Sequence, residues 1–236
     1  MIIPLREGEL ENYGARYKFA TSQEVKASLN IMKLLNCAGY PFCARYEEVV
    51  FGNKSYSSMA LMDERSYNIF SIGGPYGNSF ACFILRRYFK NFIMSCGVDM
   101  YEKCNKFEKA EFYCPHNDDQ YYVKYLDNNG EEQFIYYNQG YQSNYIVMIK
   151  MTEADFNYSV HGTVHLLWGG RADVTEAASK VFLQHEKEIY KKLKKRKKHY
   201  FIVCEYYKEF GLDFDKWYDL TDIMFKKIDK KEGTIC

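Results

Sequence analysis

The chain has 236 residues, of which 47% are hydrophobic and 18% aromatic, and its 32 basic and 31 acidic side chains give a net charge of +1. This composition excludes a disordered chain, and the length supports one sizeable core. The balanced charge argues against a nucleic-acid-binding module, because no overall field would attract a polyanion. No apolar run is long enough to span a membrane, and charges at Arg6, Glu7 and Glu9 interrupt any signal-peptide pattern. We expect a cytoplasmic single domain over residues 1–236, with no membrane partner.

The first predicted element is a helix that begins near the TSQE sequence at 21–24, which has capping-box spacing, and ends at Gly39. A strand is predicted within 42–51, and a turn follows at 63–65. These two segments contain the weak catalytic candidates Glu48 and Asp63. Glu47 lies on the opposite strand face from Glu48, so the two cannot act as a pair in one site. Solvated surface carboxylates are the alternative interpretation, and whether the chain is an enzyme stays open.

Residues 66–92 predict a strand, a loop and a helix in succession. An apolar run over 67–72 stops at Gly-Gly-Pro, and an amphipathic helix over 78–92 follows, with Asn78 as its N-cap. A helix N-terminus has unpaired amides and a partial positive charge, and glycine lets a ligand approach the backbone closely. The loop therefore predicts a binding site for an oxyanion or a polar ligand.

Residues 93–144 differ in character from the rest of the chain. Short runs rich in tyrosine and phenylalanine alternate with turn signals such as Pro-His-Asn-Asp at 115–118 and Asp-Asn-Asn-Gly at 127–130. This pattern predicts an inserted region of antiparallel β-hairpins.

The strand, diglycine and helix pattern recurs after residue 144. Strands are predicted over 145–151, 163–168 and 200–207, a helix over 174–198 and a last helix over 214–228, followed by a frayed tail at 229–236. Apolar strands separated by a long helix favour parallel pairing through a right-handed crossover. We therefore predict an α/β fold with a Rossmann-like, mostly parallel sheet flanked by helices and interrupted by the antiparallel insertion.

The two diglycine loops contain the predicted ligand-binding residues. Loops at the carboxyl ends of strands in open α/β sheets are the usual ligand sites of such folds. The alternative is structural, with glycines that end buried strands and polar residues that cap helices. The predicted residues are Gly73, Gly74, Pro75, Asn78 and Ser79 in the first loop, and Gly169, Gly170, Arg171, Asp173 and Thr175 in the second.

Other polar clusters have weaker functional interpretations. His161 and His165 are four residues apart, but Gly162 and a strand pattern separate them, so helical zinc geometry fails and neither a metal nor a cofactor is predicted. The eight cysteines fall mostly within apolar patterns and are predicted to be buried thiols in a reducing compartment. Seven basic residues in the run KKLKKRKK at 191–198 fit either a solvated helix end or an anionic partner.

The paired units at 72–78 and 167–175 resemble Rossmannoid nucleotide-recognition modules of bacterial signalling and antiviral systems. The resemblance implies a sensor or regulatory domain that binds a nucleotide or a nucleotide-derived small molecule between the two loops. A second hypothesis is an enzyme that cleaves a nucleotide or N-glycosidic bond. A third is a protein interaction module, a homo-oligomer or a complex with a protein partner, in which the central tyrosines form the contact surface.

Overall fold

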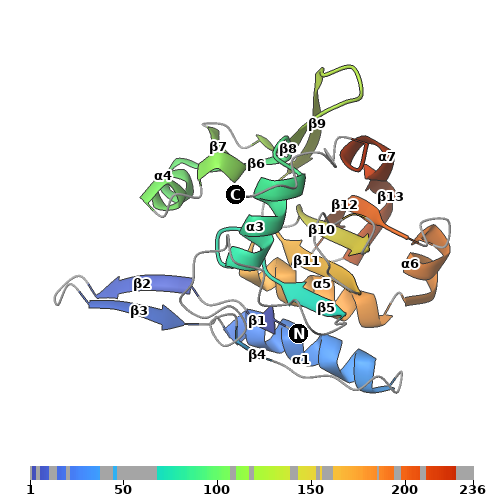
Figure 1. Cartoon of the computed structure of the whole chain (residues 1–236), viewed down its shortest axis with the longest axis horizontal. Coiled ribbons are helices and arrows are strands. Elements are labelled where there is room, and N and C mark those ends of the chain that lie inside the picture. Colours follow the sequence, from blue (N-terminus) through green and yellow to red (C-terminus); the bar gives the residue numbers. More distant parts are fainter. Residues whose placement is uncertain are drawn as a thin grey trace, which may run out of the picture.

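The main sheet has seven strands in the order β13-β12-β10-β11-β5-β1-β4 (Figure 1). A computed structural model describes residues 2–3, 6–10, 15–19, 22–37, 45–46, 68–106, 110–116, 120–138, 143–152, 155, 162–184, 186–193, 198–207 and 211–226. Within these residues the sheet consists of β1 (Ile2–Ile3), β4 (Arg45–Tyr46), β5 (Ile69–Ile72), β10 (Ser143–Thr152), β11 (Thr163–Gly169), β12 (Tyr200–Tyr207) and β13 (Gly211–Asp219).

Apolar side chains cover both faces of this sheet, because β10, β11 and β12 are almost uninterrupted apolar runs. Alternate residues of each strand enter different core clusters: Val147 and Leu166 enter one, whereas Met148 and Leu167 enter the other. This alternation follows from the two-residue period of a strand. The main sheet is therefore the buried middle layer of the molecule.

Helices α1 (Ser22–Cys37) and α5 (Ala172–Gln184) cover one face of the sheet. Helices α3 (Ser79–Tyr88) and α7 (Thr221–Met224), together with a second sheet, cover the other face (Figure 1). As predicted, the chain is an α/β protein, and the first helix lies within the residues where its capping box and apolar face placed it.

The prediction of a mostly parallel sheet is wrong. β10 pairs antiparallel with both β11 and β12, and β13 pairs antiparallel with β12. β11, β5, β1 and β4 pair in parallel, over shorter registers. β11 and β12 do run in the same direction, but β10 lies between them. An apolar run indicates a buried strand without indicating its neighbour, so sequence patterns do not reveal this insertion.

Two helix predictions near the C-terminus also need correction. Residues 214–219, predicted as the start of a helix over 214–228, belong to strand β13, because pairing with β12 decides their structure and LDFD at 212–215 alternates apolar and polar residues as a strand does. Within the described residues after β13, which end at 226, the one helix is the short α7. The long helix predicted over 174–198 consists of α5 and a separate helix, α6 (Glu186–Leu193). The predicted frayed tail at 229–236 lies outside the described residues.

The second sheet has the order β7-β6-β8-β9 and is formed by β6 (Ile93–Gly97), β7 (Tyr113–His116), β8 (Gln120–Leu126) and β9 (Glu132–Asn138). The predicted hairpin at 127–130 joins β8 and β9, and Asp127 Oδ1 accepts hydrogen bonds from the amides of Asn129 and Glu131. The region is not wholly antiparallel, however. β6 and β7 pair in parallel, and helix α4 (Val98–Lys106) comes between them in the sequence.

Strands β2 (Arg6–Leu10) and β3 (Ala15–Phe19) form a separate antiparallel pair. In the described part of the chain, no helix is both long and apolar enough to cross a bilayer. The cysteine side chains described there are free thiols, of which Cys82, Cys96 and Cys204 are buried, as predicted, and Cys114 is partly buried.

His165 is a titratable group within the sheet face that α1 and α5 cover. Its ring stacks on Phe70 with centroids 5.4 Å apart, and Tyr200 Oη lies 3.4 Å from His165 Nδ1. Burial, together with the nearby charge of Lys150, lowers the pKa of His165 to about 4. The folded protein therefore holds this imidazole neutral at neutral pH.

This lowered pKa predicts a loss of stability in acid. In the unfolded chain the imidazole takes a proton near its ordinary pKa of about 6.5, so folding stability is fully present above that pH and falls as the pH decreases toward 4. The loss should reach about 3 kcal/mol at most. Urea unfolding at about pH 7 and about pH 4.5 should show a smaller acid loss for His165→Phe than for the wild type. Equal acid losses of stability for the two proteins would show that His165 is not the source of this pH dependence.

Candidate functional site

The two diglycine loops lie side by side, because the strands that precede them are neighbours. β5 and β11 pair in parallel with Leu167 opposite Ile72, so both strands end at the same edge of the sheet. The amide of Gly73 donates to the carbonyl of Leu167 at 3.0 Å, which joins the start of the first loop to the end of β11. Gly73 has a φ of 103°, a conformation that favours glycine.

The chain leaves these two strand ends toward opposite faces of the sheet. After β5 it enters α3, whose residues Phe80 and Ile84 belong to one core cluster. After β11 it enters α5, whose residues Val174 and Ala178 belong to the other. Two adjacent parallel strands whose following helices diverge in this way form a topological switch point, the position outside which open α/β sheets bind ligands.

Asn78 holds the first loop together from a fully buried position. Its Oδ1 accepts from the amides of Phe80 and Ala81, which caps α3, and its Nδ2 donates to Ser71 Oγ at 2.7 Å and to the Ile72 carbonyl at 2.9 Å. A side-chain amide has two acceptor lone pairs and two N–H donors. All four are used within the fold, so the Asn78 side chain links the end of β5 to the start of α3 by hydrogen bonds.

The rest of the first loop is packed closely against β11. The amides of Gly77 and Asn78 both donate to the Gly74 carbonyl, which closes a tight turn. A Cβ placed on Gly74 would lie 2.9 Å from Trp168 Cδ1, so the glycine permits this contact with the indole ring. Pro75 is buried and Gly74 partly exposed.

In the second loop, Thr175 and the two glycines are likewise engaged. Thr175 Oγ1 accepts from the Gly169 amide at 3.0 Å and donates to the Arg171 carbonyl at 3.1 Å. The Gly170 amide donates to the Tyr145 carbonyl at 3.1 Å. A side chain at Gly170 would overlap Asn144 Oδ1 and the Tyr145 ring, so β10 and this loop fit together only with glycine there.

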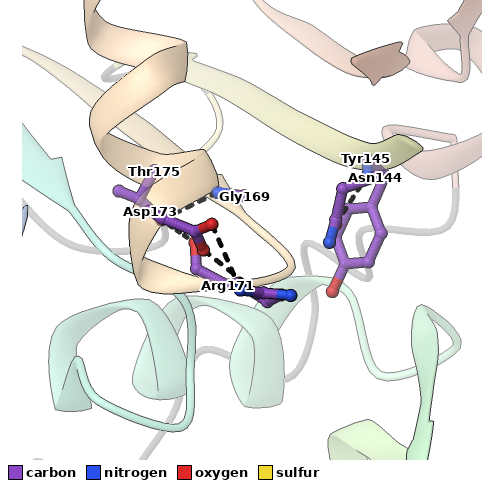
Figure 2. A network of polar contacts seen from close by, with 6 residues as sticks. All are labelled: Asn144, Tyr145, Gly169, Arg171, Asp173 and Thr175. Carbon is purple, nitrogen blue, oxygen red and sulfur yellow. Dashed lines mark hydrogen bonds and ion pairs between the residues drawn. The ribbon is translucent and has the colours of Figure 1, made fainter. Parts of the chain in front are cut away.

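Arg171 and Asp173 are the exposed charged pair of the second loop (Figure 2). Their side chains are 59% and 56% exposed, and Arg171 Nε lies 3.1 Å from Asp173 Oδ1. A second contact, from Arg171 Nη2 to Asp173 Oδ2 at 3.2 Å, makes the pair bidentate. Exposed pairs of this kind contribute little to stability, and a guanidinium presents the donor geometry that carboxylates and phosphates match.

The structure thus brings both predicted loops together at one edge, while the ligand-binding role of their residues stays a prediction. The side chain of Ser79 and the candidates Glu48 and Asp63 lie outside what the structure describes. Asn144 and Tyr145, which β10 brings against the second loop, were missed from the sequence (Figure 2). No local pattern marks them, because their position depends on pairing between distant strands.

Among the described residues, no group of three or more His, Cys, Asp or Glu side chains is arranged to hold a metal ion. Comparison of the chain with protein-family models, with curated proteins and with solved structures finds no match. The geometry of the loops is therefore the basis for any functional assignment.

Replacement of Asn78 by alanine should destabilise the protein strongly. The substitution removes the helix cap and leaves Ser71 Oγ and the Ile72 carbonyl without this donor, so we expect a loss of about 2–4 kcal/mol in urea unfolding.

Asn30→Ala is the matched control for this measurement. Among the described residues, Asn30 Nδ2 donates to Ser179 Oγ at 2.9 Å, a contact between α1 and α5. Its replacement should cost about 1 kcal/mol or less. If Asn78→Ala lowers the free energy of unfolding no more than Asn30→Ala does, the linking role of Asn78 is contradicted.

Proposed function

We propose that this chain binds a nucleotide or a nucleotide-derived small molecule at the edge where β5 and β11 end, and that it serves as a cytoplasmic sensor or regulatory domain. The observation that supports the proposal is the switch point. Two glycine-containing loops follow adjacent parallel strands, and their helices diverge to opposite faces. Open α/β sheets place their ligands at this position.

The charge of this edge favours an anionic ligand. Helices α3 and α5 both begin here, and a helix N-terminus has a partial positive charge. Asn78 already accepts from the amides of Phe80 and Ala81, so we assign the main anion contact to the second loop. Arg171 supplies an exposed guanidinium there.

Asp173 gives the second loop a further polar group of opposite charge. A phosphate can replace the Asp173 carboxylate as the partner of Arg171 at a small cost in free energy, because both side chains of the pair are exposed. The released carboxylate is then free to accept from a ligand hydroxyl, such as that of a ribose. One loop would thus offer a phosphate partner and a sugar partner, which is the reason to propose a nucleotide over a simple anion.

We propose a Rossmann-like nucleotide-binding arrangement for one part of the main sheet, namely the parallel strands β11, β5, β1 and β4 with helices on both faces. We propose binding without turnover, because the polar side chains described in the loops serve capping and packing, apart from the Arg171–Asp173 pair.

Replacement of Arg171 by glutamine should weaken nucleotide binding about tenfold or more, since a charge-assisted bidentate contact is lost. Isothermal titration and thermal shift measurements with nucleoside mono-, di- and triphosphates and with dinucleotides would measure this effect.

Arg86→Gln is the matched control, because Arg86 is an exposed arginine of α3 that pairs with Glu111 away from the loops. It should leave the affinity unchanged. The proposal fails if the wild-type chain binds no member of the panel, or if Arg171→Gln binds as tightly as the wild type.

A further inference from the structure

Helix α6 presents a basic surface to solvent. Ile189 is buried and Leu193 packs against the core, so these two residues, four apart, mark the inward side of the helix. The outward residues are exposed, and Tyr190 is 70% exposed. We define the α6 basic face as the exposed residues Lys187, Tyr190, Lys191 and Lys192; Glu188 is exposed among them.

Positive charge is concentrated in this part of the sequence to an extent that the composition of the whole chain conceals. Residues 191–198 hold seven of the 32 basic residues, yet the entire chain has a net charge of only +1. The rest of the chain is therefore net acidic. In the described part of the chain, the α6 basic face has three exposed lysines against Glu188, and charges this close together sum within a Debye length of about 8–10 Å.

We propose that the α6 basic face is a docking surface for single-stranded nucleic acid. Lysines on one helix face match a row of phosphates in charge. Tyr190 lies among them with most of its ring exposed, and an aromatic ring beside cationic side chains is the arrangement on which unpaired bases stack. The ligand class follows from these two features together.

A bilayer fits the same surface less well. A helix that lies in the membrane interface needs a row of apolar side chains that enters the acyl region. In α6 the apolar residues Ile189 and Leu193 are directed toward the core, which leaves Tyr190 as the one aromatic group on the exposed side among the described residues of the helix.

This surface is separate from the proposed nucleotide site. α6 leads to the amino end of β12, where Tyr200 pairs with Lys150 of β10. The diglycine loops lie at the opposite end of these strands, where Ile146 pairs with Gly169. Binding at the α6 basic face can therefore be tested independently of Arg171.

The test is fluorescence anisotropy with a labelled single strand of mixed sequence, about 20 nucleotides long, at several salt concentrations from about 50 mM upward. The double variant Lys187→Gln/Lys191→Gln should weaken binding about tenfold at the lowest salt and reduce the slope of log K against log salt by about 1.4, the value for two lost phosphate contacts on a single strand. Glutamine keeps helix propensity, so α6 should remain folded.

Lys26→Gln/Lys33→Gln on α1 is the matched control, because both lysines are exposed and the charge change is the same. This control should bind like the wild type. Equal weakening by both double variants would indicate attraction by net charge alone and would overturn the proposal.

Tyr190→Ala separates stacking from charge. It should weaken binding to the base-containing strand about fivefold or more and leave binding to inorganic polyphosphate unchanged. No binding at about 50 mM salt, no effect of Tyr190→Ala on the strand, or tighter binding to phosphatidylserine vesicles than to the strand would each overturn the proposal.

Discussion

The parallel pairing of β5 with β11 is the interaction on which the functional interpretation depends. It places residues 73 and 169, far apart in sequence, at one edge of the sheet, and the Gly73 amide extends the ladder by its hydrogen bond to Leu167. The following helices then diverge because each must bury its apolar face against a different side of the sheet. Without this pairing the two diglycine loops would be unrelated turns.

Tight packing makes this edge preformed. Gly74 lets the first loop approach Trp168, Gly170 lets β10 approach the second, and Asn78 uses every hydrogen-bonding position it has. Side chains that packing holds in this way are not available to rearrange around a ligand. The exposed pair of Arg171 and Asp173 can exchange partners instead, so we place recognition there and a supporting role in the buried residues.

Local patterns predicted the local elements well. The capping box at 21–24, the turn at 127–130 and the Asn78 cap each depend on residues close in sequence, and the structure has a helix, a hairpin and a capped helix at those places. Strand order was not predictable in this way. β10 separates β11 from β12, and β13 replaces a predicted helix, because pairing between distant strands decides both. For the same reason, the sequence did not predict that Asn144 and Tyr145 lie beside the second loop.

The most direct measurement of whether the two loops form one ligand site is a nucleotide titration of the ¹⁵N-labelled protein by NMR. The amides of Gly73, Gly74 and Ala172 would be followed together. We expect residues of both loops to shift with a single binding constant, since one ligand would contact both strand ends. Shifts confined to one loop, or different binding constants for the two loops, would contradict a shared site.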